Sequence, residues 1–355
     1  MSTIIEKFNQ WLNERLKLDK GLAFLHHKGV PQHKHSFWYL FGGLSLFFFT
    51  VQLITGMLLL VYYSPTPESA HESMVNIVSV VPFGWLIRSV HKWSANLMII
   101  SVLTHLASTF FMRSYRKPRE VMWISGVIQM FLVFGFAFTG SLLPWDTLAY
   151  FATQIGTEIP RTIPVIGETV VKILRGGDYV DGESLKRLFA LHVSILPLAT
   201  LVVVIFHLAL NQVHGTSTPL SVKPEKKSLP FYPNYIYRDV IAWIIGFSIL
   251  FVLVLSFPAE LGAKANPYAS PPVGIKPEWY FLPLYQTLKI LPASMFGINT
   301  DILVNVCVGL FGFLLLAIPF LDRKASIGQA NKLFTIAGAC VLIYFVAMIV
   351  LAYMN

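Results

Sequence analysis

Long apolar stretches divided by polar segments dominate the pattern of this sequence. Seven uninterrupted apolar stretches can be read, at roughly residues 36–62, 93–113, 121–142, 187–213, 239–257, 302–321 and 333–353. Each is near or above the ~20 residues that a helix, rising ~1.5 Å per residue, needs to cross the hydrocarbon of a bilayer. We therefore predict an all-α membrane protein with seven transmembrane helices and with its two ends on opposite sides of the membrane.

The composition agrees with lipid as the main solvent. Of the 355 residues, 55% are hydrophobic and 13% are charged, whereas a soluble domain of this size needs far more charged surface. Lysine and arginine are unevenly distributed: 17 fall on the side of the amino terminus and 10 on the other side. The positive-inside rule then places the amino terminus on the cytoplasm-like (n) side, opposite the p side. Anionic headgroups account for the net charge of +9 without a nucleic-acid partner.

We divide the chain into four parts. Residues 1–35 begin with apolar positions at helical spacing among charged residues over 2–18, which predicts an amphipathic helix on the n-side surface. Residues 36–214 hold four spans that form a four-helix bundle. Residues 215–238 form an n-side connector punctuated by prolines, and residues 239–355 hold the last three spans.

Two p-side segments are too long to be simple connectors. They cover residues 143–186 and 258–301, and the second contains the run PPVGIKPEWYFLPLY. Loops of this length in a compact protein usually carry function. We therefore expect a functional site on the p side.

Four of the ten histidines lie deep in the predicted helices: His91 and His105 in the second span, and His192 and His207 in the fourth. Ionisable side chains are costly there and are usually functional. Spacings of 14 and 15 residues keep both histidines of a span on one face, about 21 Å apart. Because these two spans run parallel, we predict that His91 pairs with His192 near the p side. His105 then pairs with His207 further toward the n side.

Glycines occur at matching intervals in the other two spans of the bundle. Gly42 and Gly56 lie 14 residues apart in the first span, and Gly126 and Gly140 lie 14 apart in the third. A glycine level with each histidine pair lets a flat macrocycle approach the backbone. Two histidines per site suit haem iron, whereas zinc or copper needs more protein ligands. The predicted cofactors are therefore two non-covalent haem b groups with the four histidines as iron ligands.

Plainer explanations exist for each residue alone. A membrane histidine can merely hydrogen-bond a neighbouring helix, and a membrane glycine commonly serves helix packing. The coordinated spacing of four histidines and four glycines favours haem. Cys307 and Cys340 lie in apolar stretches without a CxxC or CxxCH motif, so disulfides, zinc, iron–sulfur clusters and c-type haem lack support.

Several motifs in order resemble cytochrome b of the bc1 and b6f complexes. They are GWLIRSVHKWSANLMIISVLTH (84–105), TGSLLPWD (139–146), IPVIG (163–167), RLFALHVSILPL (187–198) and KPEWY (276–280). The resemblance covers residues 36–353. The seven spans and the fifteen-residue histidine spacing look more like cytochrome b6 followed by subunit IV, fused here in one polypeptide. The eighth helix usual in the bc1 type has no counterpart.

The resemblance implies a quinol-oxidising site on the p side. Its expected quinone-binding residues are Thr139, Tyr150, Pro277 and Trp279, and its expected catalytic residues are Glu278 and Tyr280. In an apolar pocket Glu278 is suited to accept a quinol proton. The alternative is a salt bridge at the loop end to Lys276.

The resemblance also implies partners and a location. One quinol electron passes to a Rieske iron–sulfur protein and, through it, to a c-type cytochrome or a plastocyanin-type acceptor. The other crosses between the haems and reduces quinone near the n side, which couples the reaction to proton translocation. We expect a homodimeric complex surrounded by lipid in the bacterial inner membrane or an equivalent energy-transducing membrane.

Two arginines are candidates for pairing with haem propionates. Arg88 lies one turn before His91 near the p side, and Arg119 lies where the third span begins on the n side. For Arg119, a role as a positive anchor at the membrane surface is an equal alternative.

Two departures from the relatives concern the n side. In b6 a cysteine before the first-helix glycines holds a covalently attached haem, and here Leu40 occupies that position, so no covalent haem is expected. The bc1 histidine five residues after the last haem ligand is replaced by Gln212. His214 is a candidate for n-side quinone chemistry, or else a residue that caps the helix end.

Two other function classes compete with this interpretation. A di-haem b membrane anchor of a quinone-linked dehydrogenase or reductase explains the four histidines, but not the PEWY loop or the last three spans. A haem-free transporter with histidines in a proton relay is expected to show inverted repeats, and none is visible in the sequence.

Overall fold

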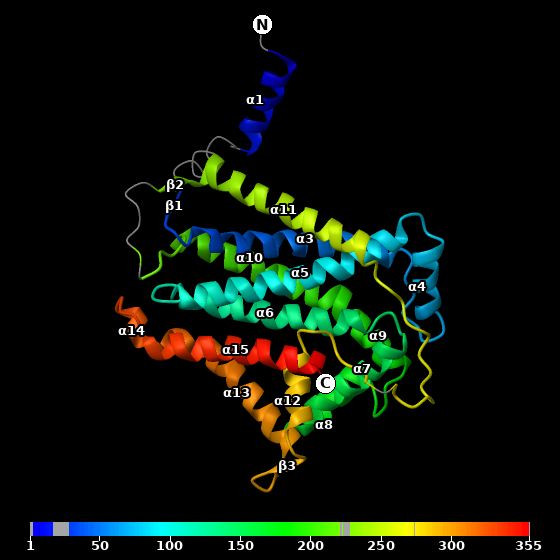
Figure 1. Cartoon of the computed structure of the whole chain (residues 1–355). Coiled ribbons are helices and arrows are strands. Elements are labelled where there is room, and N and C mark those ends of the chain that lie inside the picture. The colour runs from blue at the N-terminus through cyan, green and yellow to red at the C-terminus, as the bar shows by residue number, and fades with distance from the viewer. Residues whose placement is uncertain (1–2, 17–27, 221, 223–227, 273, 355) are drawn as a thin grey trace.

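The computed structural model describes residues 3–16, 28–220, 222, 228–272 and 274–354. Long helices make up the body (Figure 1): α3 Leu40–Leu60, α5 Gly84–Phe111, α6 Glu120–Ser141, α10 Leu196–His214, α11 Ile236–Ser256, α13 Thr300–Leu321 and α15 Lys332–Met354. Shorter helices are α1 Ile4–Leu16, η1 Ser36–Tyr39, α4 Ala70–Ser79, α7 Thr147–Glu158, η2 Ile159–Thr162, α8 Gly167–Arg175, α9 Gly182–Ala190, η3 Leu191–Ile195, η4 Phe231–Tyr235, α12 Leu282–Ile290 and α14 Arg323–Ser326. Two small antiparallel pairs join β1 Gly29–Val30 to β2 Leu229–Pro230, and β3 Ser294–Met295 to β4 Ile298–Asn299.

Seven spans were predicted, and the described part of the chain contains seven helices long and apolar enough to cross a membrane. The largest shift in bounds is in the second span, which was expected at 93–113 but begins at Gly84. The prediction required an uninterrupted apolar stretch and so left out the first turns of this helix, where Arg88, His91 and Lys92 stand among the apolar residues. Gly84 is required there, since an added Cβ would overlap the carbonyl group of Ile77.

The fourth span runs as one helix from Gly182 to His214 and contains a wide π-helical turn, η3, at Leu191–Ile195. Pro197 lies two residues after this turn. Because it has no N–H, it cannot donate to the carbonyl four residues earlier as in an ordinary helical turn. A π turn takes up one extra residue. This explains why 15 residues separate His192 from His207 while 14 suffice in the second span.

The first long p-side segment, expected as a loop, folds largely into short helices, whereas the described part of the second contains α12 and the β3–β4 pair within otherwise irregular chain. Side chains at their beginnings stabilise these helices: Asp146 accepts from the Ala149 amide at the start of α7, and Asp181 forms a capping box with Ser184 in α9. The first segment was read as a loop because its helices are short and prolines interrupt its apolar pattern. α7, α8 and α9 lie together at the p-side end of the bundle (Figure 1).

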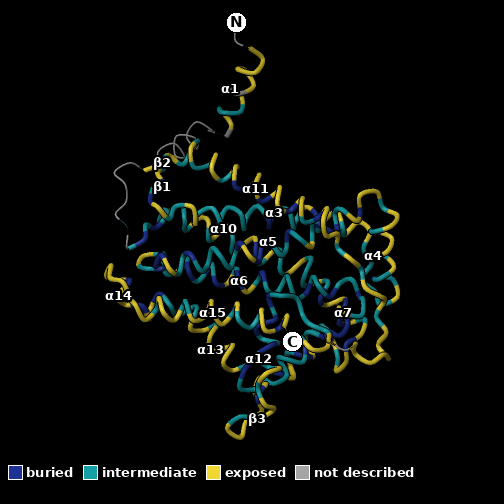
Figure 2. The backbone as a smooth tube through the Cα atoms, viewed as in Figure 1, coloured by how far each residue is buried: buried dark blue, intermediate teal, exposed yellow. Residues whose placement is uncertain are grey.

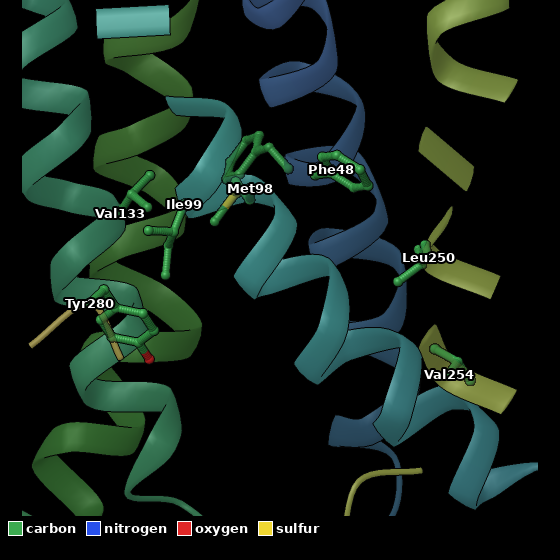
Figure 3. Packing of buried hydrophobic residues seen from close by; sticks show 8 residues of the cluster. Phe48, Met98, Ile99, Val133, Leu250, Val254 and Tyr280 are labelled. Atoms are coloured by element: carbon green, nitrogen blue, oxygen red, sulfur yellow. The ribbon is translucent and has the colours of Figure 1, made fainter. Parts of the chain in front are cut away.

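Apolar side chains from five elements pack together in one cluster (Figure 3). Its members are Phe48 and Phe49 of α3, Met98 and Ile99 of α5, Val133 of α6, Leu250 and Val254 of α11, and Tyr280 of the PEWY loop. Figure 2 shows that exposed positions recur along the outer helices, such as α11 and α15. Large apolar side chains are exposed along both helices, as helices that face lipid require.

The amphipathic amino-terminal helix was predicted at 2–18, of which residues 2, 17 and 18 lie outside the described part. α1 begins with a reciprocal cap, in which the Thr3 amide donates to Glu6 at 2.7 Å and the Glu6 amide donates to the Thr3 hydroxyl at 3.3 Å. Its apolar side chains Ile4, Ile5, Phe8 and Trp11 are all exposed. Their attachment to the membrane surface stays a prediction.

A buried polar cluster ties the first four spans to the last three on the n side. Asp322, after α13, is fully buried; its carboxylate accepts from the Tyr115 hydroxyl at 2.7 Å and from Asn331 Nδ2 at 2.8 Å. The Nε atom of buried Arg113 lies 3.3 Å from the same carboxylate. Both burial and Asp322 raise the pKa of the Tyr115 hydroxyl, which keeps it protonated as a donor.

Replacing Asp322 with Ala is expected to lower the free energy of unfolding by about 3–5 kcal/mol, because it leaves the Arg113 charge buried without its partner. The measurement is thermal unfolding in detergent, followed by circular dichroism. The control is Glu183→Ala, which removes an exposed ion pair with Lys186 at 2.9 Å and is expected to leave the unfolding temperature nearly unchanged. Equal losses in the two variants would show that the cluster does not join the two parts.

Candidate haem and quinone sites

The structure brings the four predicted histidines together in two pairs. The ring centroids of His91 on α5 and His192 in η3 lie 6.3 Å apart, with the ring planes at 70°. Two metal–nitrogen bonds of ~2.0–2.1 Å, with the radius of each ring added, give a separation of this size. His105 and His207 line one cavity of about 370 Å³ further toward the n side. This is the pairing that parallel second and fourth spans predict.

Each predicted glycine faces one of these rings. A Cβ added at Gly42 would lie 3.1 Å from Cε1 of His105, and one added at Gly140 would lie 2.5 Å from Cε1 of His192. The corresponding distances are 3.4 Å from Gly56 to His91 and 3.5 Å from Gly126 to His207. The glycines therefore leave space for the imidazole rings themselves. From the sequence they were expected to leave space for the macrocycle.

Hydroxyl groups hold three of the four histidines at Nδ1. The pairs are Thr55 and His91 at 2.8 Å, Thr139 and His192 at 3.0 Å, and Ser125 and His207 at 2.8 Å. Each hydroxyl donates its own hydrogen to a helix carbonyl, of Val51, Gly135 and Met122 respectively. It therefore accepts from Nδ1–H, which leaves the Nε2 lone pair of the histidine for a metal. The buried pairs thus fit the axial ligand set of a b-type haem.

Sequence reasoning missed these hydroxyls, although a signal was present. A Thr or Ser directly precedes Gly56, Gly126 and Gly140. Thr139 was expected to bind quinone, but the structure buries it and directs its hydroxyl to His192. We therefore assign Thr139 to the positioning of this histidine.

The cavity beside His105 and His207, here called the n-side cavity, also has polar walls. Lys28 Nζ donates to Gln212 Oε1 at 2.6 Å, and Arg119 donates to the His214 carbonyl at 2.8 Å. Removal from water lowers the pKa of Lys28 and of Arg119. Arg119 lies where a propionate partner is expected. The ring of His214 is not among the groups that line this cavity.

Asp239 is a lining residue that sequence reasoning missed. Its carboxylate lies against the backbone of α3, where a Cβ added at Gly43 would be 3.1 Å from Oδ1. That oxygen is buried and has no hydrogen-bond partner among the described residues. A lone aspartate in the first turn of an apolar span was the available signal.

The PEWY loop of the p side packs between α5 and α6. Trp279 donates to Asn96 of α5 at 2.7 Å, and the ring of Tyr280 lies 6.4 Å from that of Phe134 on α6. Figure 3 shows Tyr280 beside Val133 and Ile99. Burial, and after it the Glu278 carboxylate, raises the pKa of the Tyr280 hydroxyl well above its usual range. Tyr280 therefore stays protonated beside Glu278.

Glu278 is half-buried and is not held by the expected alternative partner. Lys276 Nζ donates to the Ala352 carbonyl at 2.6 Å instead. Within the described part of the chain, no ion pair or hydrogen bond engages the Glu278 carboxylate. Pro277 lies next to it in the same half-buried turn.

Tyr150 and Arg88 occupy supporting positions on the p side. Tyr150 is buried, with its ring 5.6 Å from that of Trp145, in a cluster against which Ile275 of the PEWY segment packs. Arg88 donates to the carbonyls of Ala259 and Glu260 at 2.5 and 2.9 Å. A guanidinium has five N–H donors, so these bonds leave capacity for a propionate.

Two family models match the sequence. "Cytochrome b/b6/petB" covers residues 26–215, and "Cytochrome b(C-terminal)/b6/petD" covers residues 264–355. The chain belongs to the cytochrome b family. The family implies b haem bound without a covalent link, and the two matches confirm that both parts stand in one polypeptide.

Relatives in several organisms support this membership. The chain is 48% identical to the cytochrome bc complex cytochrome b subunit of Chlorobaculum thiosulfatiphilum, over 94% of this chain and 78% of that protein. It is 32% identical to cytochrome b of Rickettsia prowazekii, over 92% and 82% of the two chains. A solved hyperthermophilic respiratory Complex III chain superposes with a TM-score of 0.87 at 30% identity, over 98% of this chain and 91% of that one.

Leu40 is the residue that the resemblance to cytochrome b6 matches to a haem-linking cysteine. It opens α3 and faces a second cavity, of about 690 Å³, between α3 and α11. Cys307 and Cys340 are exposed on α13 and α15, and neither lines the n-side cavity. No cysteine sulfur is therefore placed to form a thioether at that cavity.

Replacing His105 or His207 is expected to remove one b haem while leaving the spectrum of the p-side haem largely intact. Replacing His91 or His192 is expected to do the reverse, because each iron needs both of its own imidazoles. Low-temperature absorption spectra of the purified variants measure this. Loss of the same spectral component from the His91 and His105 variants would contradict the pairing.

Denaturing electrophoresis is expected to strip all haem from the polypeptide. Leu40 has no sulfur, so haem staining should show no band at the mass of this chain. Leu40→Cys is the informative counterpart, since it places a sulfur at the start of α3. A stained band from the unaltered chain would refute the argument from Leu40.

Proposed function

We propose that this chain is the cytochrome b subunit of a bc-type complex that oxidises quinol on the p side and reduces quinone near the n side. The observation that carries the proposal is the stack of two histidine pairs between the PEWY loop and the n-side cavity. Four histidines, His91, His192, His105 and His207, would hold two b haems. Bound there, the haems supply single-electron transfer across the membrane.

On the p side, Glu278 is the proton acceptor for quinol. Its carboxylate is half-buried and has no competing partner among the described residues. Tyr280 beside it remains a neutral hydrogen-bond donor, which suits it to orient a quinol oxygen toward the carboxylate. Trp279, tied to Asn96, fixes the loop against α5.

On the n side, quinone reduction needs protons and compensation for negative charge. Asp239 offers a carboxyl group with an unengaged oxygen at the cavity wall, and Lys28 offers a cation at its rim. A positive charge close to a quinone oxygen stabilises the negative charge that develops during reduction. Gln212, bound to Lys28, positions that ammonium group.

The comparisons supply the expected assembly. The Chlorobaculum relative is named as a subunit of a cytochrome bc complex, and the structural relative belongs to a respiratory Complex III. We infer a Rieske iron–sulfur partner and a c-type cytochrome, in a homodimeric complex of an energy-transducing membrane such as the bacterial inner membrane. A di-haem anchor of a dehydrogenase would leave residues 264–355, with their cytochrome b match, without a role.

Changing Glu278 to Gln is expected to slow quinol oxidation by about 10²–10⁴-fold, the usual cost of losing an acid–base group. The amide keeps the shape of the side chain, so both haems should remain bound. Stopped-flow reduction of the b haems by quinol, together with steady-state turnover, measures the effect.

A control variant and an n-side variant allow the turnover of Glu278→Gln to be interpreted. Glu183→Gln removes an exposed p-side carboxylate that pairs with Lys186, and it should leave turnover unchanged. Asp239→Asn should instead preserve haem reduction at the p side and slow reoxidation at the n side. Turnover of Glu278→Gln close to the unaltered rate would mean that this carboxylate is structural.

A further inference from the structure

The last span, α15, is hydrogen-bonded to the chain on both sides of the PEWY loop. Before the loop, Lys276 Nζ donates to the carbonyl of Ala352 at 2.6 Å. After the loop, in α12, the Thr287 hydroxyl donates to the Pro283 carbonyl at 2.6 Å, so it accepts a hydrogen bond from the Tyr344 hydroxyl. The helix α12 packs against α15 near the carboxyl end of the chain (Figure 1).

These two contacts define the separation of the two ends of the loop. Tyr344 and Ala352 lie eight residues apart on α15, which corresponds to about 12 Å of helix. Because a helix has a fixed rise, the contact points on α15 keep this separation. Glu278 and Tyr280, the residues proposed to handle quinol, lie between the tethered positions 276 and 287.

The carbonyl of Ala352 is well suited to bind a lysine. The helix α15 ends at Met354, and the last four carbonyls of a helix have no partner within it. The helix dipole also places negative charge at this end, which attracts a cation. Ala352 is buried and Lys276 is half-buried, so water competes little for this contact.

The same contact determines where the charge of Lys276 lies. Lys276 and Glu278 are two positions apart, and the flexible four-carbon stem of a lysine is long enough to reach a carboxylate at that separation. A cation beside a carboxylate favours its ionised form and makes it a weaker proton acceptor. Lys276 is bound to Ala352 instead, and no ion pair engages Glu278 within the described part of the chain.

We propose that α15 is the positioning element of the quinol site: it holds both ends of the PEWY loop, and its terminal carbonyl keeps the cation of Lys276 away from Glu278. The inference rests on the proposed function, in which Glu278 accepts a quinol proton. Lys276, Thr287 and Tyr344 are positioning residues that act through the loop. The last span thereby has a role that neither histidine pair requires.

The first experiment is a double-mutant cycle that measures turnover of the purified complex with duroquinol as electron donor. Ending the chain after Ile349 removes the Ala352 carbonyl and releases Lys276, and turnover is expected to fall about tenfold. Adding Lys276→Met to the shortened chain should restore most of the rate, because no cation then remains to pair with Glu278. In the full chain, Lys276→Met and Lys276→Arg should each change turnover by less than about threefold.

The matched control for the shortened chain ends after Tyr353. It keeps the Ala352 carbonyl and should turn over at the unaltered rate. Two results of the cycle would overturn the inference. One is full turnover in the chain that ends after Ile349, and the other is a loss that Lys276→Met does not relieve.

The second experiment measures how firmly the loop is held, without any turnover. Tyr344→Phe keeps the ring and removes the hydroxyl that donates to Thr287. Amide hydrogen exchange in peptides covering residues 276–287, measured by mass spectrometry, is expected to become about fivefold faster, as the loss of one hydrogen bond allows. Tyr353→Phe is the control on the same helix, because the exposed hydroxyl of Tyr353 makes no hydrogen bond to another described residue. It should leave the exchange unchanged.

The full-length variants decide the question if the chain that ends after Ile349 does not assemble. Exchange at residues 276–287 that stays at the unaltered rate in both Tyr344→Phe and Lys276→Met would overturn the positioning role of α15. Failure of the proposed function gives a different result. In that case Glu278→Gln turns over normally, while exchange in the loop still responds to the two α15 contacts.

Discussion

The structure depends on keeping four histidines in the apolar interior of a membrane bundle. A buried imidazole has two nitrogens, and each needs a partner, because an unpaired polar group in such surroundings costs several kcal/mol. Hydroxyls beside three glycines take the Nδ1 atoms, and the glycines bring those hydroxyls close by leaving space for the ring. These bonds leave the Nε2 lone pairs of the three histidines for a metal, so the same arrangement that tolerates the histidines also creates the ligand sets.

Much of the fold and of the histidine site could be predicted because both follow from periodicity. The number of spans follows from apolar length, and the pairing of His91 with His192 follows from parallel helices. Local departures from regular helix could not be predicted from periodicity. The π turn at Leu191–Ile195 depends on Pro197, and the short p-side helices depend on capping side chains such as Asp146.

The quinone sites were less predictable than the histidine pairs, for a physical reason. Their residues come from segments distant in sequence, so no spacing rule relates them. Lys28 precedes the first span and Asp239 begins the fifth, yet both line the cavity that holds His105 and His207. Thr139 was assigned to quinone from its place in the motif TGSLLPWD, which did not reveal that its hydroxyl lies against His192.

The parts of the chain before and after residue 230 both contribute to the sites on each side of the membrane. The first four spans carry the histidines, while the PEWY loop and Asp239 come from the part beyond residue 230. Hydrogen bonds set the register between them: Trp279 donates to Asn96 on the p side, Trp243 donates to the Gly43 carbonyl at 3.1 Å, and Tyr115 donates to Asp322 on the n side. These contacts are between side chains and helices and do not require the connector at 215–238. A fused chain and two separate subunits can therefore make the same three contacts between these parts.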